Sequence, residues 1–149
     1  MSHYFEDMPV GFSFETESAT LTREAIVGFA KDWDPQPFHL DEKAAEQSHF
    51  GKLIASGWHT LLTAFNLAMQ AGVWDESSMG ASGMDEVRWL QPARPGDEIH
   101  VTAEVIEATR SASRPTFGRV RFRYAVIRQD GEVIASYIGN HLIKARTSG

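Results

Sequence analysis

The sequence of 149 residues contains no cysteine, which excludes disulfide bonds, thiolate nucleophiles and zinc sites with cysteine ligands. No run of about 18 apolar residues occurs, so a transmembrane helix is not expected. The first residues are acidic and lack the apolar stretch of a signal peptide. Together these absences fit the reducing cytoplasm, where we expect the protein to reside.

Basic charge is also scarce, because 14 lysines and arginines stand against 20 aspartates and glutamates, for a formal net charge of -6. This balance argues against general binding to nucleic acid. The six histidines include no pair with helical His-x-x-x-His spacing, so we expect no metal site. The length suits one domain, residues 1–149, and a hydrophobic content of 42% supplies its core.

The most informative segment is residues 34–41, with the sequence DPQPFHLD. Each proline locks its own φ and pushes the residue before it toward extended geometry. We therefore expect a rigid, non-helical segment that holds Asp34 and His39 at a fixed separation. Such placement suits an acid/base pair that transfers protons. The alternative is that Asp34 only closes a turn and His39 is an ordinary loop histidine.

A second candidate is the sequence SGWH at residues 56–59, which opens a helix predicted over residues 58–71. A helix N-terminus presents unpaired N–H groups, and Gly57 allows a ligand to approach the backbone closely. This arrangement could hold a carbonyl oxygen that becomes an enolate. The alternative is that Ser56 is only an N-cap. The helix is apolar nearly all round, so we expect it to be buried on most sides.

The remainder of the chain predicts a sheet. Two shorter helices are expected, one capped by Thr22 and ending before Pro35 and one over residues 42–47. Alternating apolar residues and turn signals predict strands over residues 11–21, 84–90, 99–105, 120–126 and 133–143. A curved antiparallel sheet wrapped around the long central helix is an α+β fold. Its exposed edge would pair with a second copy, so we expect a homodimer or higher oligomer.

These pieces together resemble the MaoC-like dehydratases, a family that includes the (R)-specific enoyl-CoA hydratases and has the hot-dog fold. The family loop Asp-x-Asn-Pro-x-His-x-Asp matches DPQPFHLD in register. Its helix entry, Phe-Gly-x-x-Ile-x-His-Gly-Met, corresponds to FGKLIASGW at residues 50–58. A third match is RWLQPARPGD at residues 88–97, and the resemblance covers residues 10–144.

The resemblance implies reversible hydration of an enoyl-CoA thioester, with coenzyme A as part of the substrate and no separate cofactor. It implies that Asp34 and His39 are the catalytic pair and activate water. The residues expected to bind the thioester or stabilise its oxyanion are Gly57, Gln36, Ser56, Trp58 and His59. The chain departs from the family pattern in having Gln36 for Asn, Ser56 for His, Trp58 for Met, and Phe65 where hydratases have a serine.

Two other functions stay open at this point. Hot-dog acyl-CoA thioesterases commonly place a catalytic Asp or Glu on the central helix, and residues 58–71 contain neither. A non-catalytic homologue that binds acyl-CoA is the other alternative, and Gln36 and Phe65 are the departures that favour it. In each case the expected partner is an acyl-CoA thioester, with no nucleic acid and no membrane.

Overall fold

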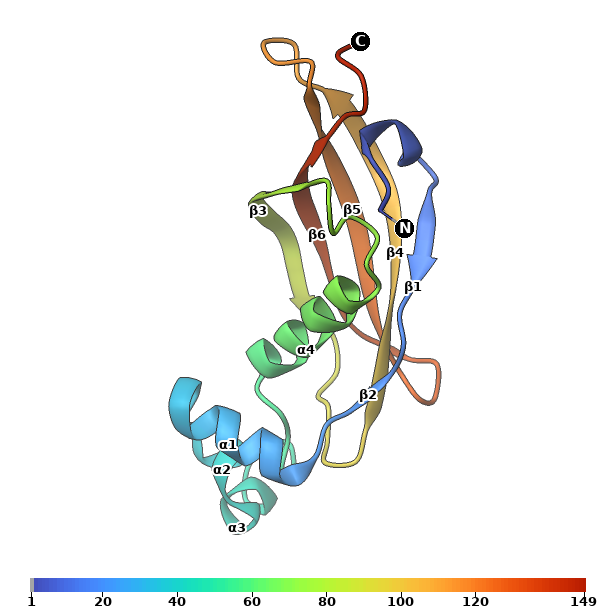
Figure 1. The fold of residues 1–149 in the computed structure, drawn as a ribbon. Coiled ribbons are helices and arrows are strands. Elements are labelled where there is room, and N and C mark those ends of the chain that lie inside the picture. Colours follow the sequence, from blue (N-terminus) through green and yellow to red (C-terminus); the bar gives the residue numbers. More distant parts are fainter. Residues whose placement is uncertain (1) are drawn as a thin grey trace.

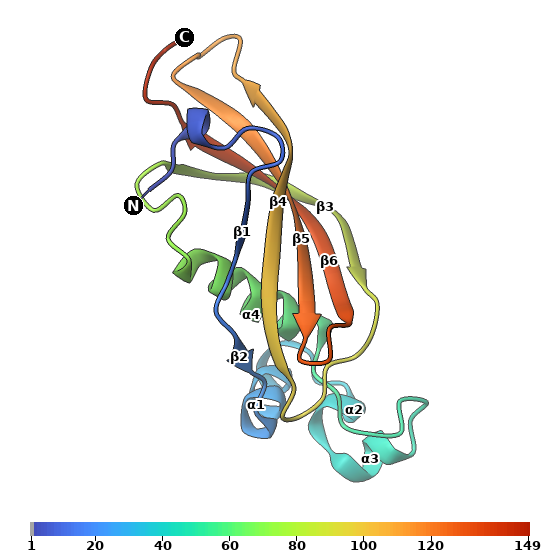
Figure 2. The same ribbon diagram turned by 90° about the vertical axis from the view of Figure 1, so that its right-hand side faces the viewer.

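The computed structural model describes residues 2–149 and consists of an antiparallel sheet with one long helix across its face (Figure 1). Three short helices gather at one end of the molecule, whereas both chain termini lie toward the other end (Figure 2). In chain order the elements are η1 (Phe5–Asp7), β1 (Ser13–Glu15), β2 (Ala19–Thr20), α1 (Arg23–Trp33), α2 (Pro37–Leu40), α3 (Glu42–Glu46), α4 (Gly57–Gln70), β3 (Ser78–Trp89), β4 (Glu98–Arg110), β5 (Phe117–Arg128) and β6 (Val133–Lys144).

The strands form a six-stranded sheet in the order β1-β4-β5-β6-β3, with β2 also paired to β4. Every pairing is antiparallel. The sheet curves around α4, which confirms the predicted α+β hot-dog architecture. Among the described residues 2–149, no helix combines the length and the hydropathy needed to cross a membrane.

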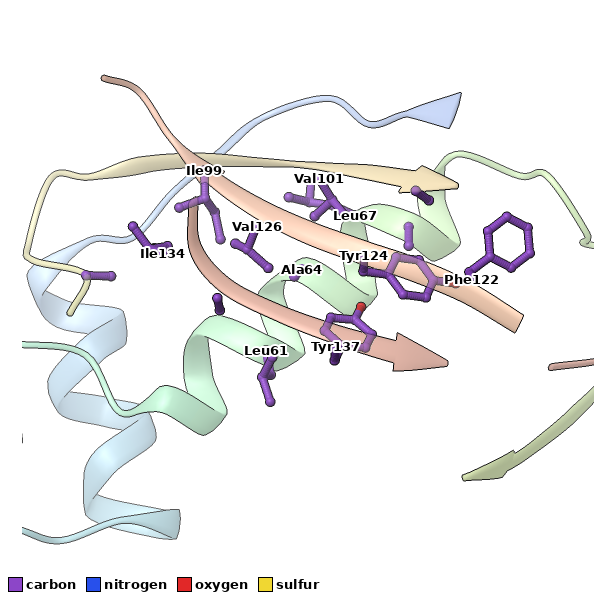
Figure 3. Packing of buried hydrophobic residues seen from close by; sticks show 14 of the residues in the cluster. Leu61, Ala64, Leu67, Ile99, Val101, Phe122, Tyr124, Val126, Ile134 and Tyr137 are labelled. Carbon is purple, nitrogen blue, oxygen red and sulfur yellow. The ribbon is translucent and has the colours of Figure 1, made fainter. Parts of the chain in front are cut away.

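The core lies between the sheet and α4 (Figure 3). Alternate residues of β4 and β5 point toward the helix, as the period-2 pattern predicts for a half-buried sheet. The helix contributes one side of its surface to this core. The buried side chains are Ile99, Val101, Ala103 and Val105 of β4, Val120, Phe122, Tyr124 and Val126 of β5, and Leu61, Ala64, Leu67 and Ala68 of α4.

The prediction that residues 34–41 are wholly non-helical is wrong, because Pro37–Leu40 form the one-turn helix α2. Proline fits the first position of a helix, where its missing N–H has no intrahelical partner to lose. The steric restriction falls instead on Gln36, which has φ -84° and ψ 142° and is the N-cap outside the helix. Asp34 is the C-cap of α1.

The prediction that α4 is buried on most sides is also wrong. Trp58, Leu62 and Phe65 have exposed fractions of 57%, 53% and 48%. Their spacing of four and three residues places them on one face of the helix. The sheet of a single chain covers only the opposite face, so an apolar stripe of α4 remains uncovered.

Two strands also differ in extent from their predictions. The strand expected over residues 11–21 is split into β1 and β2, because the hydroxyl of Thr16 accepts the N–H of Val101 at 2.9 Å in place of a backbone carbonyl. Strand β3 is longer than predicted and begins at Ser78. Three irregularities in its pairing with β6, together with Gly80 and Gly83, hide the alternation on which the prediction depended.

Candidate active site

A cavity of about 440 Å³ lies where three parts of the chain meet. Residues 34–39 contribute Asp34, Gln36 and His39, and the start of α4 contributes Gly57. The end of β3 and the loop after it supply Trp89 and the residues up to Ala93. The structure therefore gathers most of the predicted site residues around one space.

Asp34 and His39 face each other in this cavity. His39 Nε2 lies 3.3 Å from Asp34 Oδ2, and the two side chains have exposed fractions of 5% and 17%. His39 Nδ1 lies 2.8 Å from the carbonyl oxygen of Ile54. Because a carbonyl only accepts, Nδ1 must carry a proton. In the neutral imidazole this leaves the lone pair on Nε2, the nitrogen on the side of Asp34.

The carboxylate of Asp34 is held by two donors. Ser56 Oγ donates to Oδ2 at 2.6 Å, and Gln36 Nε2 donates to Oδ1 at 2.7 Å. Burial acts to raise the pKa of Asp34, but the hydrogen bonds from Ser56 and Gln36, together with the positive charge that His39 carries when it is protonated, outweigh it and lower the pKa. Asp34 is therefore a carboxylate at neutral pH. Gln36 thus fills the family's asparagine position with an amide that reaches Asp34.

The first turn of α4 forms another wall of the cavity. Gly57 is the first helical residue, and Ser56 is the N-cap whose Oγ accepts the N–H of Trp58 at 3.3 Å. Within residues 2–149 no acceptor receives the N–H of Gly57. A helix N-terminus carries partial positive charge. This wall therefore offers a donor to an oxygen atom bound in the cavity.

Trp89 is the residue of this site that the sequence analysis missed. A Cβ at Gly57 would lie 2.5 Å from Trp89 Nε1 and Cε2, so a larger residue at this position would displace the indole ring. Trp89 also meets Trp58 edge to face, with 5.4 Å between ring centroids. The only sequence signal for it is an aromatic residue at the end of a strand, directly before a Pro-containing turn.

Two predicted site residues do not line the cavity. Ser56 is completely buried and acts on Asp34 rather than on a ligand. The prediction that His59 lies beside Gly57 in the pocket is wrong. It follows Gly57 by two residues, about 200° around the helix, and its ring stacks on Phe29 with centroids 4.9 Å apart. Phe65 lies on the exposed stripe, outside the cavity.

Comparison with known proteins gives concordant results. Residues 7–126 match the family of MaoC-like domains. The MaoC-like dehydratase from Rhodospirillum rubrum is 38% identical in sequence with a TM-score of 0.91, and the match covers 97% of this chain and 99% of that one. The 3-hydroxybutyryl-CoA dehydratase of Methylorubrum extorquens is 32% identical over 105 residues, 70% of this chain and 64% of the relative. The R-hydratase of Pseudomonas aeruginosa has a TM-score of 0.73, and the match covers 96% of this chain and 86% of that one. Its sequence is only 23% identical, so this likeness supports the fold alone.

Proposed function

This chain belongs to the family of MaoC-like domains, and we propose that it catalyses the reversible addition of water to the α,β double bond of an enoyl-CoA thioester. The product is a 3-hydroxyacyl-CoA. The observation that carries the proposal is the Asp34–His39 pair, held at 3.3 Å in a cavity beside the N-terminus of α4. Relatives named as a MaoC-like dehydratase and as a 3-hydroxybutyryl-CoA dehydratase support it.

The pair suits the binding of one water molecule. The carboxylate of Asp34 can only accept hydrogen bonds, and neutral His39 presents an acceptor at Nε2. A water in the cavity that bridges the two side chains donates one O–H to His39 Nε2 and the other to the carboxylate of Asp34. Its oxygen lone pair is then free to attack Cβ of the enoyl group. Ser56 and Gln36 prevent the carboxylate from rotating out of this arrangement.

His39 takes the proton of the attacking water. A free imidazole is more basic than a free carboxylate, and the pKa of Asp34 is lowered further by its hydrogen bonds from Ser56 and Gln36, which outweigh burial. As the C–O bond forms at Cβ, the π electrons move to the thioester oxygen and give an enolate. His39 then returns the proton to Cα, and the negative charge of Asp34 stabilises the imidazolium in the meantime. Each positioned acid or base is worth about 10²–10⁴ in rate.

The enolate oxygen is bound at the N-terminus of α4. The N–H of Gly57 has no acceptor in the described chain, and Gly57 lines the cavity that it shares with the Asp34–His39 pair. A preorganised donor at such a position is worth about 10²–10³ in rate. Trp58 lines the same cavity and limits the space for the acyl group.

The proposal includes a homodimer. Strand β3 ends the sheet, and 11 of its 12 residues are exposed. Exposed apolar side chains lie along it, such as Met79 and Met84, and the stripe on α4 is also uncovered. An exposed edge of this length is a template for a second strand. A twofold-related copy would pair with β3 and cover the stripe.

One set of assays distinguishes hydratase activity from the two alternative functions, thioesterase activity and acyl-CoA binding without catalysis. Purified protein is given crotonyl-CoA, hexenoyl-CoA and decenoyl-CoA, and loss of the enoyl absorbance is followed. Hydration of at least one of these supports the proposal. Release of free thiol from saturated acyl-CoAs identifies a thioesterase, which the absence of Asp and Glu from α4 disfavours. Binding of acyl-CoA without either reaction identifies the non-catalytic homologue.

A further inference from the structure

We propose that Lys52 and Arg94 bind the phosphate groups of coenzyme A in a groove next to the cavity of Asp34 and His39. This inference rests on the proposed function and extends it from the acyl end of the thioester to its phosphate end. Among the described residues that line the cavity there is no lysine or arginine. The phosphate groups are anionic at neutral pH, so they need cations outside the cavity.

A groove of about 470 Å³ adjoins the cavity and is lined by both Lys52 and Arg94. Lys52 follows the cavity residue Phe50 by two positions, and Arg94 directly follows another cavity residue, Ala93. The backbone N–H of Ala55 donates to the carbonyl of Ala93 at 2.8 Å. The two segments thus lie side by side, and each contributes to both the cavity and the groove.

The groove lies within reach of a substrate bound in the cavity. Five residue steps join Lys52 to Gly57, so their Cα atoms are at most about 18 Å apart. The pantetheine arm that joins the thioester of coenzyme A to its phosphates has an extended length of the same order. A substrate whose thioester lies beside Gly57 can therefore extend this arm to the groove.

Both cations are free to bind an anion. Lys52 and Arg94 are exposed, and neither side chain forms a salt bridge or hydrogen bond within residues 2–149. Glu42 and Glu46 also line the groove, but Glu42 is paired with Arg23. Two unpaired cations thus stand against one unpaired carboxylate, in a chain of net charge -6. An arginine fork and a lysine ammonium are both suited to phosphate oxygens.

The decisive variants are Lys52→Gln, Arg94→Gln and the double variant, each assayed with crotonyl-CoA and crotonyl-pantetheine. The second substrate has the same thioester but lacks the phosphates. We expect KM for crotonyl-CoA to rise about two- to fivefold in each single variant and about tenfold in the double variant, as for exposed ion pairs. The kcat values and KM for crotonyl-pantetheine should stay unchanged. Added salt should raise the wild-type KM for crotonyl-CoA alone.

The matched control is the double variant Lys43→Gln with Arg114→Gln. Both residues are exposed cations without a salt bridge in the described chain, and neither lines the groove. The control loses the same charge, so it tests whether the effect comes from the overall field of the protein. It should keep the wild-type KM for crotonyl-CoA.

A binding measurement separates this subsite from the reaction itself. Calorimetry compares butyryl-CoA with butyryl-pantetheine, and neither ligand has a double bond to hydrate. The variant lacking Lys52 and Arg94 should bind butyryl-CoA about tenfold more weakly and butyryl-pantetheine as the wild type does. Wild-type affinity in that variant, an equal loss in the control, or a wild type without preference for butyryl-CoA overturns the inference. If the wild type hydrates no enoyl-CoA, the proposed function fails, and the binding result alone decides the subsite.

Discussion

Ser56 Oγ donates a hydrogen bond of 2.6 Å to Asp34 Oδ2, and the same oxygen accepts the N–H of Trp58 to cap α4. One fully buried hydroxyl thus connects the carboxylate of the segment 34–41 to the helix whose N-terminus lines the same cavity. The position of Asp34 relative to Gly57 therefore depends on Ser56, although Ser56 itself does not line the cavity.

Replacement of Ser56 by alanine should shift the pH dependence of activity. The hydrogen bond favours the charged form of Asp34, so its loss raises the pKa of that carboxyl. Since the proposed reaction needs ionised Asp34, the acid limb of the kcat/KM profile should move to higher pH. The lost N-cap should also destabilise the fold by about 1 kcal/mol. Steady-state kinetics against pH and urea unfolding measure these two effects.

Thr22→Ala is the matched control for this variant. Thr22 caps α1 by accepting the N–H of Ala25 at 3.1 Å and has no contact with Asp34. It should lose about the same 1 kcal/mol and keep the wild-type pH profile. An acid limb that moves equally in both variants, or in neither, would show that Ser56 acts only as a cap.

Asp34→Asn and His39→Gln should each reduce crotonyl-CoA hydration by at least about 10²-fold, because each removes a group that handles the water proton. Both variants keep polar side chains of similar size, so circular dichroism should show the wild-type fold. Single-turnover assays at saturating substrate provide the measurement. Near-normal activity in either variant removes that residue from the mechanism.

His141 should make stability depend on pH between about 4 and 6.5. Burial lowers the pKa of His141 to about 4, and its Nε2 lies 2.7 Å from the hydroxyl of Tyr124. As pH falls below the ordinary histidine pKa of about 6.5, the unfolded chain binds a proton that the folded chain does not. The free energy of unfolding should therefore decrease from pH 6.5 to 4, and it should decrease less in His141→Gln.

The matched control is His49→Gln, which removes an exposed histidine. Urea unfolding at several pH values should give a slope for this control close to that of the wild type. A wild-type stability that stays level over this interval would contradict the buried, neutral state of His141.

Met84→Lys and Phe65→Lys should shift the protein from dimer toward monomer, because each places a charge where the proposed second copy covers an apolar side chain. Analytical ultracentrifugation over a range of concentrations tests this. Val10→Lys alters an exposed apolar residue next to β1, at the opposite edge of the sheet from β3, and should leave the assembly unchanged. A wild-type monomer at all concentrations would exclude the dimer.

Much of the fold was predictable because local chemistry specifies it. Thr22 caps α1 as expected, Asp41 caps α3 through the N–H of Ala44, and Gly72 takes a positive φ of 70° after α4. The buried alternation of β4 and β5 reproduces the pattern in the sequence. Prediction failed at α2, where proline was treated only as a helix breaker, and at β3, where bulges and glycines remove the period-2 signal.

The candidate site was likewise predictable only in part. The sequence by itself determined which residues are the candidate acid/base pair, because Asp34 and His39 lie five residues apart on a segment stiffened by two prolines. It also determined that the helix beginning at Gly57 contains no carboxylate. Only the tertiary structure decided that Trp89 lies against Gly57 and that His59 points away. Contacts between β3 and α4 join residues more than 30 positions apart, and local propensity contains no information on which side chains such packing brings together.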